Sequence, residues 1–149
     1  VKNPKLLAEI SRKFGRCATV LGLDANRITI DGREVWHVFV NGGRVDTGID
    51  VMKWVKEAES LGAGEIVLNV MNADGTQAGY DLEMTAAVSE AVTIPVVASG
   101  GAGSPEHMLR VLQEGKADAA LAATIFHFRT HSVEEVKRYL HAHGVAVRL

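Results

Sequence analysis

The chain has 149 residues, a formal net charge of −2 and an apolar fraction of 47%, which fit one ordinary globular domain or part of a larger one. Acidic and basic residues are mixed along the chain, so nothing in it indicates a nucleic-acid or membrane partner. The sequence contains neither a signal-peptide pattern nor an apolar run long enough to span a bilayer.

The first residues predict a helix. Asn3 followed by Pro4 is typical of a helix start, and the helix is expected to cover residues 4–14. Its apolar side is expected to carry Leu6, Leu7, Ile10 and Phe14. Because the chain begins at Val1, without a methionine and directly at a helix start, we expect a fragment of a longer protein.

Residues 17–25 form a continuous apolar run, which is typical of a strand buried on both faces in a parallel sheet. Cys17 lies in this run, so we expect a buried, reduced thiol, consistent with a cytoplasmic protein. Residues 27–44 instead alternate between apolar and polar, with β-branched and aromatic side chains and a possible tight turn at Asp31-Gly32. This pattern predicts a β-hairpin inserted after the first strand.

The rest of the chain alternates between predicted helices and strands. Thr47 and Asp50 resemble a capping box that opens a helix to about residue 61. The elements expected after it are strand 65–71, loop 72–81, helix 82–92, strand 96–99, a helix starting at Ser104-Pro105, a short strand at 119–124 with one helical turn, and a helix with a Ser132–Glu135 capping box that ends near residue 143. Four strand–helix units predict an α/β fold with a parallel sheet. They could be half of an eight-unit barrel or an open flavodoxin-like sheet.

A glycine-rich turn follows strand 96–99 and precedes a helix. Gly100 and Gly101 would let backbone N–H groups approach an anion closely, and the helix start adds positive potential. The next strand ends in the small residues Ala123 and Thr124. In barrels, phosphate is often bound between two such neighbouring strand ends, so a phosphate site is predicted here. The alternative is that the glycines only form a tight turn.

Three acidic residues are candidates for other roles. Asp24 ends a predicted strand, where it could be a general acid or base or could cap the turn into the hairpin. Asp74 belongs to an Asp-Gly pair, which is also ordinary turn chemistry. Glu65 begins its strand, at the end opposite the expected ligand face, and is by itself a solvated glutamate. The histidines show no spacing typical of a metal site, so we expect no metal here.

Several segments together resemble a known family. They are "GLDANR", "GAGEIVLNVMNADGTQAGYDLEM", "VVASGGAGSPEHM", "ADAALAATIFHF" and "HGVAVRL". Over essentially the whole chain, they resemble the C-terminal half of the cyclase subunits of imidazole glycerol phosphate synthase, from histidine biosynthesis. The sister isomerase of that pathway shares "DGT" and "ASGG" but does not usually carry "FHF" and "HGVAVR", so the cyclase is favoured.

The resemblance implies that residues 1–149 form a single partial domain, the C-terminal half of a (βα)8 TIM barrel. It implies an enzyme that reacts ammonia from a glutaminase partner with a doubly phosphorylated substrate, without a cofactor. The products are imidazole glycerol phosphate and an aminoimidazole carboxamide ribotide. Asp24 would be one of two catalytic aspartates, and Glu65 would match a charged residue at the ammonia entrance. The substrate and phosphate side would be formed by Asn69 (where the family often has threonine), Asp74, Gly75, Ser99, Gly100, Gly101, Ala123 and Thr124.

The same resemblance implies that other parts are missing. The second catalytic aspartate and the second phosphate site would lie in the first half of the barrel. We therefore expect the chain to be inactive alone and to need either the missing N-terminal half or a second copy of itself. The alternatives are a phosphate-binding half-barrel that self-associates without turnover, or the related sugar-phosphate isomerase.

Overall fold

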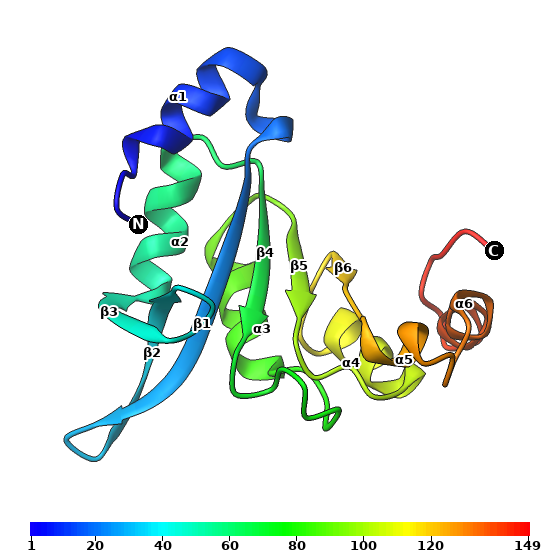
Figure 1. Cartoon of the computed structure of the whole chain (residues 1–149). Helices are drawn as coiled ribbons and strands as arrows, with labels where there is room; N and C mark the ends of the chain where they lie inside the picture. Colours follow the sequence, from blue (N-terminus) through cyan, green and yellow to red (C-terminus); the bar gives the residue numbers. More distant parts are fainter.

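The computed structural model describes all 149 residues and shows a six-stranded sheet in the order β3-β2-β1-β4-β5-β6 (Figure 1). The strands are β1 (Val20–Ile30), β2 (Arg33–Val40), β3 (Val45–Asp50), β4 (Glu65–Val70), β5 (Val96–Ser99) and β6 (Ala119–Ala120). The helices are α1 (Lys5–Phe14), a 3₁₀ turn (Arg16–Ala18), α2 (Val51–Ser60), α3 (Leu82–Ala91), α4 (Pro105–Gln113), α5 (Thr124–His127) and α6 (Val133–Ala142).

Strands β1, β4, β5 and β6 are parallel neighbours in their chain order. A barrel requires this sequential order, whereas a flavodoxin-like sheet places its second strand outside its first. The order therefore favours the half-barrel and confirms the predicted α/β class with four parallel strands. Ser132 and Glu135 also form the predicted capping box at the start of α6.

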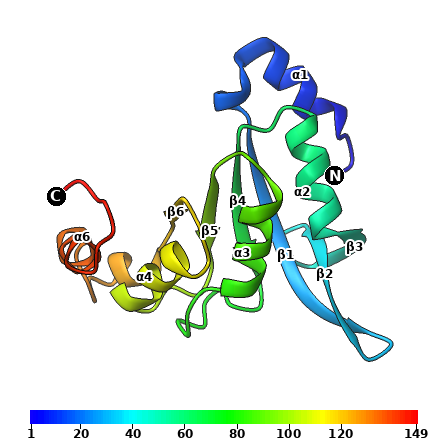
Figure 2. The same cartoon turned by 180° about the vertical axis from the view of Figure 1, so that it is seen from behind.

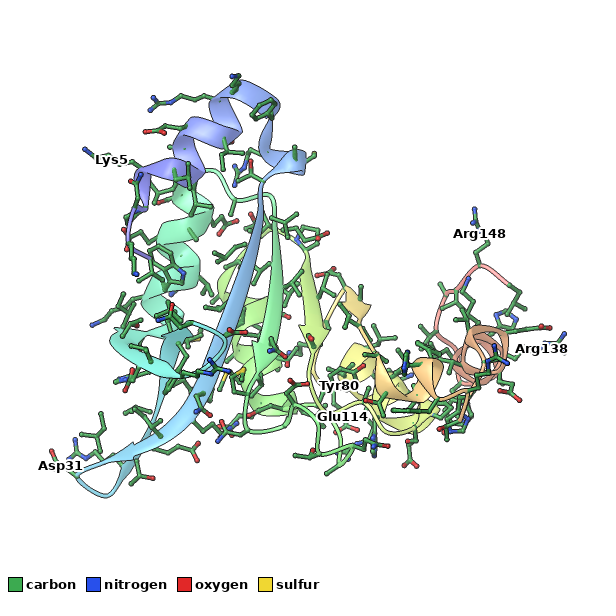
Figure 3. The ribbon with its side chains drawn as sticks, in the orientation of Figure 1. Lys5, Asp31, Tyr80, Glu114, Arg138 and Arg148 are labelled. Atoms are coloured by element: carbon green, nitrogen blue, oxygen red, sulfur yellow. The ribbon has the colours of Figure 1, made fainter.

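The predicted β-hairpin is present, but it continues from the first parallel strand without a break. The amino-terminal half of β1 pairs with β4, and its carboxyl-terminal half, from Asp24 onward, pairs antiparallel with β2. The turn residues Asp31 and Gly32 have φ angles of 50° and 74°, as expected for the type I′ turn that suits strand twist. Asp31 lies at the tip of this arm, away from the helices (Figure 3).

The capping box predicted at Thr47 is wrong. Thr47 lies within β3, where its hydroxyl donates to the Val38 carbonyl at 2.7 Å. Asp50 itself is the N-cap of α2 and accepts the Lys53 N–H at 2.9 Å. The chain turns back after β2 through left-handed residues 41–43, so a third strand occupies the stretch before the helix.

The helices cover only one face of the sheet. Figure 2 shows α3 in front of the strands on this face and α2 beside it. The side chains directed to it are buried, among them Leu21, Leu23, Ile66, Leu68, Val96 and Ala98. The opposite face, which we call the open face, carries exposed Val20 and half-buried Val67 and Val97. Burial of the first strand on both faces was therefore predicted wrongly for this chain, because no layer covers the open face.

The amino-terminal part of the chain is little buried, and the burial predicted for Cys17 is wrong. Helix α1 has no buried residue, and its apolar side chains Leu6 and Phe14 are exposed. Cys17 is exposed as well, because it belongs to a 3₁₀ turn and the strand begins only at Val20. No helix combines the length and apolar character needed to cross a membrane.

Arg27 joins the hairpin to the start of α3. Its guanidinium pairs with Glu34, Asp81 and Glu83 and lies 5.2 Å from the ring centroid of Trp36. Burial opposes ionisation of Asp81, but hydrogen bonds from Arg27 and from the backbone N–H of residue 84 outweigh it and hold the pKa of Asp81 below its usual range. Because the folded-state pKa is lowered, this stabilisation is present above about pH 4 and is lost as the pH falls through the folded pKa.

We expect Asp81→Asn to lower the free energy of unfolding by about 2 kcal/mol at neutral pH, since it removes charge-assisted hydrogen bonds. Asparagine still caps α3, so the loss reports the ion pair. The matched control Glu83→Gln changes a carboxylate whose side chain is 72% exposed and should cost less than about 0.5 kcal/mol. Urea unfolding at one protein concentration measures both. The expectation would be contradicted if both variants lost the same free energy of unfolding. It would also be contradicted if the loss in D81N were as large at pH 3 as at neutral pH.

Candidate functional site

Three polar side chains form a row across the carboxyl ends of the parallel strands. Asp24, Asn69 and Ser99 occupy the same register level on β1, β4 and β5. The Asn69 amide donates to Asp24 Oδ1 at 3.1 Å, and the Ser99 hydroxyl donates to Asn69 Oδ1 at 3.3 Å. All three side chains are half-buried on the open face. The bond from Asn69 fixes one oxygen of Asp24, and no hydrogen bond within the chain uses its Oδ2.

A cleft of about 50 Å³ lies beside this row, several times the space that one water requires. Its walls are the β4–α3 loop, the glycine turn after β5 and the segment after β6. Seven of the residues predicted for substrate binding line it: Asp74, Gly75, Ser99, Gly100, Gly101, Ala123 and Thr124. Asn69 and Asp24 adjoin the cleft through Ser99. That any of these nine residues binds a substrate stays a prediction.

The glycine turn has a local structural reason. Gly100 and Gly101 have φ angles of 91° and 100°, which disfavour residues with a Cβ. A Cβ on Gly101 would lie 2.0 Å from the Gly79 carbonyl oxygen, and the Gly79 N–H donates to the Gly101 carbonyl at 2.8 Å. Tight packing of the two loops therefore requires these glycines whether or not an anion binds.

The N–H groups in this turn are the second feature of the cleft. Gly100 and Gly101 are buried, and their N–H groups, like that of Ala123, donate to no acceptor within the chain. Buried backbone donors are almost always paired, because leaving one unpaired is costly. The cleft thus presents free donors from two neighbouring strand ends, an arrangement that suits an anion.

Glu65 lies at the other end of the barrel axis. It begins β4, in register with Val20, and is four residues from Asn69, or about 13 Å along the strand. The fold therefore does not bring Glu65 to the cleft. Its position at the amino end of the strand agrees with the sequence expectation.

Two residues that shape the cleft were missed from the sequence. The buried Tyr80 donates its hydroxyl to the Leu121 carbonyl at 2.8 Å, which ties the β4–α3 loop to the end of β6 (Figure 3). Burial also raises the pKa of Tyr80 above its usual value. His107 accepts the Gly103 N–H on Nδ1 at 3.1 Å. The contact of Tyr80 joins residues far apart in the chain, and that of His107 depends on the conformation of the turn, so no local pattern in the sequence indicates either.

Comparison with known proteins agrees with this arrangement. The chain is 49% identical, over all of its 149 residues, to the imidazole glycerol phosphate synthase subunit HisF of Clostridium botulinum. It spans 58% of the length of that relative. The model of the family described as histidine biosynthesis protein matches residues 1–132. With the sequential parallel strands and the cleft at their carboxyl ends, these matches show that the chain belongs to the histidine biosynthesis protein family.

Proposed function

We propose that residues 1–149, as one partial barrel domain, supply the C-terminal half of a cyclase of imidazole glycerol phosphate synthase. The reaction would join ammonia to a doubly phosphorylated ribulosyl aminoimidazole carboxamide ribotide and release imidazole glycerol phosphate, aminoimidazole carboxamide ribotide and the water lost on ring closure. The observation that carries the proposal is the set of unpaired N–H groups at Gly100, Gly101 and Ala123 around one cleft. The identity to a HisF subunit over the whole chain favours the cyclase over the related isomerase.

One phosphate of the substrate would bind in this cleft. Backbone N–H groups can hold a phosphate without a metal, because several donors converge on its oxygens. Gly75 and Thr124 add polar backbone and hydroxyl groups to the same walls. The phosphate would anchor one end of the substrate and direct the reacting part along the open face toward Asp24.

Asp24 would transfer a proton as a general acid or base. Asn69 donates to its Oδ1 at 3.1 Å, and Oδ2, which has no hydrogen bond within the chain, would take or give the substrate proton. Ser99 in turn donates to Asn69, so the amide is oriented with its NH₂ group toward the carboxylate. The row would therefore position one carboxylate oxygen beside the anchored substrate.

The other requirements of this reaction lie outside the chain. A second catalytic carboxylate, the site of the second phosphate and a glutaminase that releases ammonia would come from partners. The completing half would be an N-terminal half-barrel or a second copy of this chain. Glu65 would stand at the ammonia entrance, since it lies at the amino end of the strands on the open face. We place the assembled enzyme in the cytoplasm.

Ala123→Asp is the most direct test of the anion cleft. A carboxylate there should weaken binding of inorganic phosphate at least tenfold by charge repulsion at close range. Ala123 is exposed, so the fold should tolerate the change. The control Ala142→Asp adds the same charge to an exposed residue of α6 outside the cleft. Calorimetric titration measures both, and equal affinity of the two folded variants would contradict the proposal. Gly101→Val is less suitable, because it would displace the Gly79 carbonyl.

A second candidate function is phosphate binding by a self-associated half-barrel without turnover. The exposed apolar side chains Val20 and Leu121 favour association. An ammonia-dependent assay on the chain combined with the missing N-terminal half separates the two functions, because only the cyclase proposal expects turnover once that half completes the barrel.

A further inference from the structure

His107 lies where the two loops of the cleft meet. It is in the first turn of α4, and its Nδ1 accepts the Gly103 N–H at 3.1 Å. Its own N–H donates to the hydroxyl of the N-cap Ser104 at 3.3 Å. A Cβ placed on Gly79 would meet atoms of the His107 ring at 3.7–3.9 Å, so the ring packs against the β4–α3 loop.

Contacts of the same loops extend from His107 to the cleft. Gly79 donates its N–H to the Gly101 carbonyl at 2.8 Å. Gly103 approaches the other loop so closely that a Cβ on it would lie 2.1 Å from the Gln77 carbonyl oxygen. The position of Gly103 therefore constrains both walls, and His107 is the only side chain that accepts its N–H. His107 itself does not line the cleft.

We propose that His107 is a positioning residue for the anion cleft. By accepting the Gly103 N–H, it holds the turn in the conformation that places Gly100 and Gly101, with their unpaired N–H groups, in the wall of the cleft. This role requires a neutral ring with its proton on Nε2, because a ring nitrogen that carries a proton cannot accept. The inference rests on the proposed anion binding at this cleft, and it adds a residue that acts without touching the ligand.

Two substitutions separate the hydrogen bond from the bulk of the ring. His107→Asn places a carbonyl oxygen at the position of Nδ1 and can still accept from Gly103. His107→Leu fills similar space without an acceptor. We expect H107N to bind inorganic phosphate within about threefold of the unchanged protein, and H107L to bind about five- to tenfold more weakly, as expected for loss of one hydrogen bond.

Three measurements on the 149-residue protein decide the outcome. Calorimetry gives the phosphate affinities. Amide exchange should show the Gly103 N–H protected in the unchanged protein and in H107N, and faster in H107L. Imidazole nitrogen spectra of the unchanged protein should show the Nε2–H tautomer, which needs no variant to fold.

The outcomes are distinguishable. Absence of phosphate binding by the unchanged protein would overturn the proposed function and this inference with it. Phosphate binding that is equal in the unchanged protein and H107L would overturn the inference alone. A proton on Nδ1 of His107, or H107N as weak as H107L, would also overturn it, because the acceptor would then not be what positions the turn.

Discussion

The 149-residue chain by itself is expected to sediment as a dimer or larger species at micromolar concentration. Its open face leaves Val20 47% and Leu121 46% exposed, and no element covers the half-buried Val67 and Val97 between them. On α1, Phe14 is 64% exposed. Large apolar side chains that no element covers favour association, and free strand edges add backbone groups that lack partners.

A second copy fits the geometry of the two free edges. Strand β6 has no neighbour on its outer side, and β2 pairs with β1 only from Asp24 onward, which leaves residues 20–23 unpaired on that edge. Strands β1 and β6, which carry these two free edges, run in the same direction within the sheet. Two copies could therefore join β6 of each to β1 of the other and form one ring of eight parallel strands with the open faces inside.

A matched pair of variants tests this expectation. Val20→Glu introduces a charge on the open face beside Glu65, its register partner, where like charges repel. Val45→Glu changes a residue of similar exposure, 45%, on the outlying strand β3. Sedimentation at several concentrations should show V20E shifted toward the monomer and V45E unchanged. A stable monomer of the unchanged chain would contradict the expectation, and so would unaided cyclase turnover by such a monomer.

In a barrel completed by the missing half, Asp24→Asn should lower ammonia-dependent cyclase turnover by roughly 10²–10⁴-fold. Asparagine has nearly the same size and can still hydrogen-bond to Asn69, so the row at the strand ends should persist. It cannot exchange a proton at the position of Oδ2. Phosphate affinity should change much less than turnover, because Asp24 does not line the anion cleft.

Asp31→Asn is the matched control for the Asp24→Asn variant. Asp31 lies at the hairpin tip with a φ of 50°, a conformation that asparagine tolerates. Steady-state kinetics of both variants, with KM and kcat separated, should show a kcat loss for D24N alone. Near-normal turnover of D24N would exclude Asp24 as the general acid or base; capping of a turn is no alternative, because Asp24 lies inside the continuous strand β1.

Local patterns in the sequence were sufficient to predict most of the helices, strands and turns. The Asp31-Gly32 turn, the Ser132–Glu135 capping box and the alternation of strands and helices each depend on residues a few positions apart. The gathering of Asp74, Gly100 and Thr124 at one edge was also predictable, since the carboxyl ends of parallel strands meet there. The choice between a barrel and an open sheet was not, because periodicity reports the burial of a strand and not the identity of its neighbours.

The tertiary structure decided which side chains are buried and which loops contact each other. The sequence predicted an apolar side for α1 and burial of both faces of β1. The helices cover one face of β1, but no element of the chain covers the other face or the apolar side chains Leu6 and Phe14 of α1. It determined that glycines follow β5, yet their tight packing against Gly79 became visible only in the folded loops. Tyr80 and Leu121 are 41 residues apart, and only folding brings the hydroxyl to the carbonyl. The sequence by itself thus determined the elements and the end of the sheet where a ligand would bind, because both follow from local chemistry and strand direction. The contacts that shape the cleft join distant segments and are fixed only when those segments pack.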